Sequence, residues 1–323
     1  MPAVVMNPVA RSLATFSRTL APLASLLLQL LALLFAVATL LFFLVRLTGD
    51  PAVVIAGEYA DEATLDALRA KYGLDRSLFV QYWTFLGNAL RLDLGVSWVS
   101  HRPALELALE RVPATLALAA SGMLVNLLIA VPVGAYLGAS KRVFTRKTLA
   151  LLVFLAQGIP GYVVALYLIQ LFAVEWQLLP STGDRGLLSW ILPSVTIASF
   201  LAPKLVRVIE VNVSEAMQDE YVTIAKAQGA SYAQLVFRHA LPNALLGATA
   251  LIGAQLALLL NGIIITETIF GWPGVGRLLL DSVLLLDFTV VQSVVLVTTI
   301  FVFLANWAAD RMIEIIDPRL RVH

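Results

Sequence analysis

The chain has 323 residues, of which 60% are hydrophobic and 13% are charged, and its net charge is +1. A soluble domain carries about 25% charged residues, so this composition indicates an integral membrane protein. The net charge does not point to nucleic acid, and we expect none as a partner. The absence of cysteine excludes disulfides, thiolate metal ligands and thiol catalysis.

Six stretches contain no charged residue, and each is long enough, or nearly so, to cross a bilayer as a helix, which needs about 20 apolar residues. A backbone inside lipid must satisfy its own hydrogen bonds, which selects helices. The sequence therefore predicts an all-α polytopic protein with six transmembrane helices. The uncharged stretches are 19–45, 112–140, 148–174, 186–203, 239–266 and 288–309.

The first part of the chain is predicted as a cytoplasmic segment over 1–20, a transmembrane helix over 21–47 and an external helical segment over 48–111. Two arginines precede the first apolar run, as in a signal peptide, but the run is too long and lacks a small-residue cleavage site. We therefore expect an uncleaved anchor helix.

The external segment carries helix signals of its own. Asp61 can cap a helix that ends at Gly73, and an aromatic-rich amphipathic stretch follows over 77–92. Such aromatics favour the membrane–water interface. This stretch either packs against the bundle or forms a lid over an entrance on the outer side.

Residues 112–315 are predicted as a core of five transmembrane helices, followed by a cytoplasmic tail over 316–323. The first core helix begins after Arg111, with Pro113 in its first turn. The next one is expected to kink at its Gly158–Gly161 stretch. The expected bounds of the remaining core helices after the first are 148–176, 187–208, 242–266 and 288–315.

The distribution of lysine and arginine predicts that both termini are cytoplasmic. The short loop 141–147 has four basic residues and no acidic one, and basic residues mark the cytoplasmic side. With this orientation the cytoplasmic segments hold 13 basic and 7 acidic residues.

Five polar or charged residues stand in or beside the predicted spans. Glu267 follows an uncharged run directly, and Arg277 is its expected ion-pair partner in a re-entrant element, although a substrate contact is the alternative. Gln157, Gln255 and Asn261 either hydrogen-bond neighbouring helices or line a pathway.

The polar segment 210–244 predicts a hairpin of two short helices at the cytoplasmic face. Asp219 and Glu220 suit a helix start, Gly229 suits its end, and Ser231 with Gln234 forms a capping box. Leu241 and Pro242 are expected to turn the chain into the next transmembrane helix. Small side chains on the first helix would allow close approach of another protein, or the hairpin is a plain amphipathic surface.

This segment resembles the cytoplasmic coupling loop, or EAA motif, of ATP-binding-cassette importer permeases. Its text from Tyr221 to Gly229, YVTIAKAQG, is similar to the dipeptide, oligopeptide and nickel subfamily, with Gln228 in place of a lysine. The general motif's isoleucine is replaced by His239, and its Glu-Ala pair is absent. The coupling residues that the resemblance implies are Glu220, Tyr221, Ala225, Ala227, Gly229, Ala230, Leu241 and Pro242.

Further motifs in family order cover most of the chain. They are LTGDP at 47–51, YGLD at 72–75, DLGVS at 93–97, RVPAT at 111–115, TETIFGWPGVG at 266–276 and DPR at 317–319.

The resemblance implies an inner-membrane permease subunit that forms half of the translocation pathway for di- or oligopeptides. It implies a second homologous permease, two ATPase subunits that bind ATP and Mg, an external substrate-binding protein, surrounding lipid and no cofactor in this chain. The chain itself lacks a phosphate-binding Gly-x-x-x-x-Gly-Lys-(Ser/Thr) motif and is expected not to be an enzyme. Nickel-chelate or opine ligands are the alternative substrates, and a secondary transporter or an intramembrane enzyme are the alternative classes.

Overall fold

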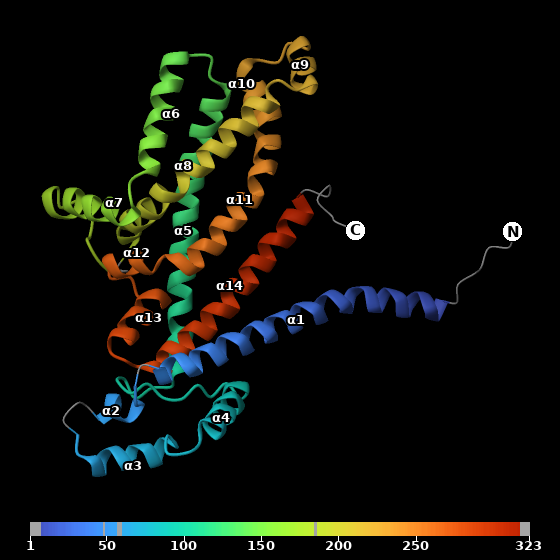
Figure 1. The fold of residues 1–323 in the computed structure, drawn as a ribbon. Coiled ribbons are helices and arrows are strands. Elements are labelled where there is room, and N and C mark those ends of the chain that lie inside the picture. Colours follow the sequence, from blue (N-terminus) through green and yellow to red (C-terminus); the bar gives the residue numbers. More distant parts are fainter. Residues whose placement is uncertain (1–7, 48, 57–59, 184–185, 317–323) are drawn as a thin grey trace.

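The computed structural model describes residues 8–47, 49–56, 60–183 and 186–316. Within these ranges the regular structure is helical, and the one strand-like pairing is an isolated bridge between Val96 and Pro103. Five helices are long and apolar enough to span a membrane, and a bent helix pair supplies a sixth span if it crosses as one unit. The predicted all-α polytopic architecture is confirmed (Figure 1).

The first helix, α1 (Pro8–Leu47), is longer than predicted because it begins at Pro8 rather than at residue 21. The uncharged run predicts the span rather than the whole helix, and proline is well tolerated at the helix start. The apolar, membrane-length part is Ala24–Leu47, which agrees with the predicted span. Residues 1–7 of the predicted cytoplasmic segment and 317–323 of the predicted tail lie outside the described residues.

The external segment contains α2 (Pro51–Ala56), α3 (Glu62–Tyr72) and α4 (Leu78–Leu90). The side chain of Asp61 accepts from the amide of Thr64, and Gly73 ends α3 with a φ of 65°, so the predicted caps are confirmed. Helix α4 packs against α1: the hydroxyls of Tyr82 and Thr39 lie 2.8 Å apart.

Helix α5 (Ala104–Ala139) begins eight residues before the predicted start at residue 112. The extra N-terminal stretch carries charged residues, and Arg102, just before the helix, contacts Glu106 at 2.7 Å and Glu110 at 2.5 Å. Pro113 therefore lies inside the helix rather than in its first turn.

The core is built on the close pairing of α5 with α8 (Ile191–Ala216). Glycines on α5 permit this contact, because a Cβ on Gly122 would lie 2.5 Å from Cγ2 of Ile197 and one on Gly134 would lie 2.7 Å from Cβ of Ile209. Small residues at a helix contact let membrane helices approach closely in this way. Helix α8 also runs past the predicted end at 208 and enters the segment assigned to the hairpin.

The predicted helix over 148–176 is instead two helices, α6 (Val143–Gln157) and α7 (Gly161–Leu168), the second extended by a π-helical stretch, Ile169–Glu175. The two directions differ by 99°. Pro160 cannot donate a backbone hydrogen bond, so the helix breaks at the predicted kink instead of bending there. Figure 1 shows α7 running sideways from the end of α6.

The C-terminal half comprises α11 (Leu241–Gly262), α12 (Ile264–Ile269), α13 (Val275–Leu284) and α14 (Phe288–Ile316). A short helical turn, Leu187–Trp190, precedes α8, while α9 (Glu220–Ala227) and α10 (Tyr232–Gln234) follow it. Figure 1 places α9 and α10 at the same end of the bundle as the α5–α6 connection, and α2 to α4 at the opposite end.

Candidate functional site

The hairpin begins as predicted, with Asp219 at the N-cap of α9 and Gly229 just beyond its end. Gly229 has a φ of 87°, and the amide of Ala230 donates to the carbonyl of Ala225 at 3.1 Å. Ser231 then caps the next helix by accepting from the amide of Gln234, whose side chain accepts from the amide of Ser231. Both cap predictions are confirmed.

Helix α9 has one buried face and one exposed face. Val222 and Ala225 are buried against Leu235 of the returning chain, so Ala225 holds the hairpin together. The opposite face presents Glu220, Ile224 and Ala227, which share a face because they are spaced four and three apart. Ile224 is 57% exposed, although no prediction had singled it out as a contact residue.

The remaining predicted coupling residues divide in the same way. Gly229 and Pro242 are exposed, Tyr221 and Ala230 are half-buried, and Leu241 is buried. The Tyr221 hydroxyl is buried with no hydrogen-bond partner in the described structure.

The connection from the hairpin to the next membrane-length helix differs from the prediction. No turn occurs at Leu241 and Pro242, because α10 continues through a π-helical turn, Leu235–Ala240, directly into α11. Pro242 lacks an amide hydrogen, and the wider turn before it accommodates the missing hydrogen bond without ending the helix. The second hairpin helix is therefore one end of a membrane-length helix, Tyr232–Leu259.

Helix α12 follows α11, at the end of α11 that is far from the hairpin. Its residue Glu267 is fully buried. Its Oε1 accepts from the hydroxyl of Thr115 at 2.6 Å, and its Oε2 accepts from the amide of Arg277 at 2.9 Å. A Cβ on Gly274 would lie only 2.0 Å from Oε1, so the turn after α12 folds directly onto the carboxylate. The carboxylate thereby joins α5, α12 and α13.

The predicted ion pair between Glu267 and Arg277 is not formed in the described structure. The guanidinium of Arg277 lies on the surface instead, 3.6 Å from the carboxylate of Asp281. The backbone amide of Arg277, rather than its guanidinium, contacts the carboxylate of Glu267. This occurs because the Gly-Trp-Pro-Gly turn brings the start of α13 next to Glu267. The side chain of Trp272 locks this turn by donating to the carbonyl of Ala114 at 2.9 Å.

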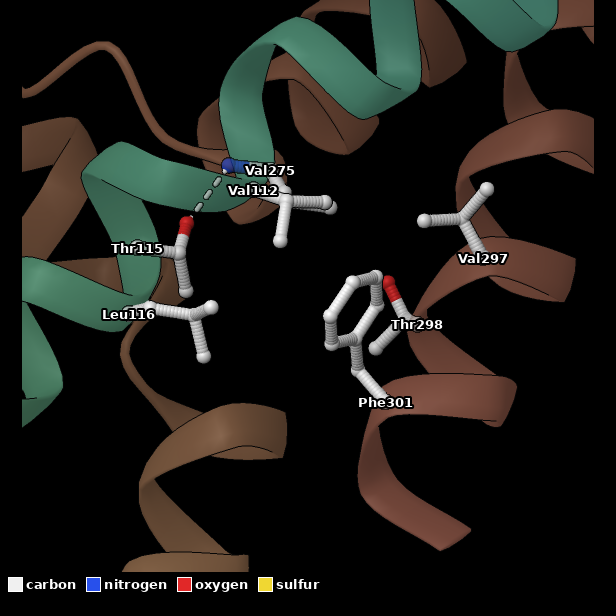
Figure 2. Close-up of a pocket in the computed structure, with 7 residues that line it drawn as sticks. All are labelled: Val112, Thr115, Leu116, Val275, Val297, Thr298 and Phe301. Carbon is white, nitrogen blue, oxygen red and sulfur yellow. Dashed lines mark hydrogen bonds between the residues drawn. The ribbon is translucent and has the colours of Figure 1, made fainter. Parts of the chain in front are cut away.

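A small cavity of about 20 Å³ lies beside this network. Figure 2 shows the hydroxyl of Thr115 directed to the amide of Val275, while Val297 and Phe301 of α14 face it across the gap. The walls are mostly apolar, so the cavity is a packing feature between α5 and α14 rather than a ligand site.

The other predicted polar residues do not gather in one place. Gln255 is buried and accepts from Asn126 at 3.0 Å while donating to the carbonyl of Leu201 at 3.0 Å, which makes it a bridge between α5, α8 and α11. Gln157 is exposed at the end of α6. The side chain of Asn261 lies outside the described residues. In the described part of the chain no three metal-ligating side chains cluster.

Comparison with known proteins settles the family. Residues 130–322 match the family described as "Binding-protein-dependent transport system inner membrane component", and residues 18–119 match the N-terminal region of such components. This chain belongs to that family.

Curated relatives of the permease are similar over nearly its whole length. The glutathione transport system permease protein GsiC of Escherichia coli (strain K12) is 32% identical over 279 residues, which are 86% of this chain and 91% of that protein. The protein of the same name from Pectobacterium atrosepticum is 35% identical over 280 residues, with the same coverage of both chains.

A solved methionine transporter, MetNI, in inward-facing form shares the fold with a TM-score of 0.57 at 22% identity, covering 67% of this chain and 98% of that chain. The permease is therefore a multi-pass inner-membrane subunit of an ATP-binding-cassette importer of the peptide and glutathione type. Its relatives are transport subunits rather than enzymes, and the family implies ATPase and substrate-binding partners.

Proposed function

We propose that this permease forms half of the pathway of an ATP-driven importer for di- or oligopeptides, and that its α9 hairpin transmits movement from an ATPase. The observation that carries the coupling role is the exposed face of α9, where Ile224 and Ala227 stand clear of the bundle while Ala225 anchors the helix beneath them. An exposed apolar side chain on a braced short helix suits docking to another protein.

The proposed orientation in the membrane rests on the basic residues at the end of the bundle that carries α9. The stretch 141–147, which joins α5 to α6 and includes the start of α6, holds four basic residues and lies at the end that carries α9, and basic segments beside membrane helices favour the cytoplasm. We place both termini and the hairpin inside, with α2 to α4 outside. Two ATPase subunits, which bind ATP and Mg, then meet this permease and a second, homologous one from within, and a binding protein delivers substrate from outside.

Alternating access would follow from this arrangement. ATP binding closes the ATPases, the hairpins move with them, and the two permeases rock as rigid bodies around the pathway between them. Peptide import is favoured because the relatives are named for glutathione, which is a tripeptide. Nickel-chelate and opine ligands are the alternative, and the ligand that co-purifies with the partner binding protein distinguishes them.

The docking role is tested at Ala227 rather than at Gly229. A side chain on Gly229 would meet open space but would be strained by the positive φ, so its effect would mix backbone strain with docking. Ala227→Tyr places bulk on an exposed helical position without that strain. We expect it to abolish co-purification of the ATPase subunits and ATP-dependent uptake in vesicles.

The matched control is Ala67→Tyr, at an exposed position on α3 at the opposite end of the chain's fold. It should leave ATPase co-purification unchanged. Normal assembly and uptake with Ala227→Tyr would refute the coupling role, and uptake in vesicles without ATP would favour a secondary transporter.

A further inference from the structure

A groove of about 680 Å³ opens between the C-terminal end of α5 and the helix that begins with α10. One wall comes from α5 and the following loop, and the other from the hairpin side. Among the described residues that line it none is acidic, and the principal ones are Tyr136, Ala139, Lys141, Arg142, Tyr232 and Phe237.

The sequence around the groove is that of a membrane boundary. The uncharged stretch 112–140 ends just after α5, and basic residues follow immediately. Tyr136 is 39% exposed and Phe237 is 65% exposed. Aromatic side chains next to lysine and arginine are the composition of a membrane–water interface.

The hairpin wall is fixed in place by local contacts. The hydroxyl of Tyr232 donates to the carbonyl of Ala139, and Nζ of Lys141 lies 5.6 Å from the centroid of the Tyr232 ring. The basic groups therefore stand at the rim of the groove, above an apolar floor. A ligand with an anionic head and an apolar tail matches this arrangement.

We propose that the groove binds an anionic phospholipid of the inner leaflet. The phosphate would pair with Lys141 and Arg142, since ammonium and guanidinium groups both bind phosphate, and an acyl chain would lie along Phe237. Because one wall belongs to the helix that carries the hairpin, the bound lipid would hold that helix against α5. The inference rests on the proposed inner-face orientation.

The test replaces one groove residue with a photoreactive one, Phe237→p-benzoylphenylalanine, in the full chain with its co-purifying subunits. The sample is placed in nanodiscs of equal phosphatidylglycerol and phosphatidylcholine with identical acyl chains, and the adducts are weighed by mass spectrometry. We expect about a fivefold excess of phosphatidylglycerol adducts, the preference that a basic residue near an anionic headgroup confers.

The double variant Lys141→Gln/Arg142→Gln should bring that ratio close to one. The control Arg146→Gln/Lys147→Gln removes the same charge from the adjoining start of α6, at residues that do not line the groove, and should keep the excess. Equal adducts of both lipids, an equal fall in both double variants, or crosslinks to an ATPase polypeptide would each overturn the proposal. Should the photoreactive variant not fold, native mass spectrometry of the remaining variants measures the same preference.

Both leaflets of such a nanodisc have the same composition. An inverted orientation of the permease would therefore leave the lipid preference unchanged, so a loss of the preference reports on the groove itself. Co-purification reports separately whether the ATPase partners are present.

Discussion

The hydroxyl of Thr115 donates to Oε1 of Glu267 at 2.6 Å while it accepts from the amide of Val275 at 2.8 Å. One side chain thus satisfies both a buried carboxylate and a buried amide, and it connects α5 to the turn between α12 and α13.

Thr115→Val keeps the shape of this side chain but removes both hydrogen bonds. Leaving two buried polar groups unsatisfied is expected to lower the free energy of unfolding by about 1–3 kcal/mol. Thermal unfolding in detergent, followed by tryptophan fluorescence, measures the change. Thr115→Ser retains the hydroxyl and should stay close to the parent, so equal losses in the two variants would assign the effect to packing.

Arg277→Gln is expected to cost about 1 kcal/mol or less, because the ion pair of its guanidinium with the exposed Asp281 lies at the surface. Glu267→Gln should cost about 1–3 kcal/mol, since the new amide places a donor against an existing donor. Both are compared in the same unfolding assay. If Arg277→Gln were as damaging as Glu267→Gln, the guanidinium rather than the backbone would hold the carboxylate.

Gly134→Ala tests the close contact between α5 and α8. Its Cβ would lie 2.7 Å from Cβ of Ile209, so the helices must separate, at a cost of about 1–3 kcal/mol. Gly87→Ala is the matched control, because a Cβ there meets no atom within 4 Å and lies in helix α4. It should be neutral or slightly stabilising, and a similar loss in both variants would argue against tight packing at Gly134.

Asp287→Ala tests how the external segment is fastened to the bundle. The Ser97 hydroxyl donates to the Asp287 carboxylate at 2.5 Å, and both residues are buried. The same carboxylate accepts from the amide of Val290 at the start of α14. We expect a loss of about 1–2 kcal/mol and faster proteolysis of the external segment, as for removal of a helix cap. The exposed Asp281→Ala should show neither effect.

The parts of the fold that the sequence could predict depend on local chemistry. Uncharged runs located the spans, and the caps at Asp61, Gly73 and Ser231 set helix boundaries within a residue or two. The early start of α5 was missed because its first two turns contain Glu106, Glu110 and Arg111, which a search for uncharged runs leaves out.

In the candidate site, too, the features set by local sequence were predicted and those set by distant contacts were not. Asp219 and Gly229 were assigned correctly because a helix dipole and a positive φ act locally. Thr115 was missed as a partner of Glu267, because 152 residues separate them and nothing in either local sequence links the two. The exposure of Ile224 was missed for a related reason, since burial of Ala225 beneath it depends on Leu235 from the returning chain.

The unbroken passage from α10 through the π-helical turn into α11 has a mechanical consequence. Tyr232–Leu259 is a span of 28 residues, and such a rod is about 42 Å long. Pivoting a rod of this length by about 10° about one end would displace its other end by about 7 Å. In the proposed coupling, a movement of the hairpin would therefore reach the far end of this helix without loss at a joint.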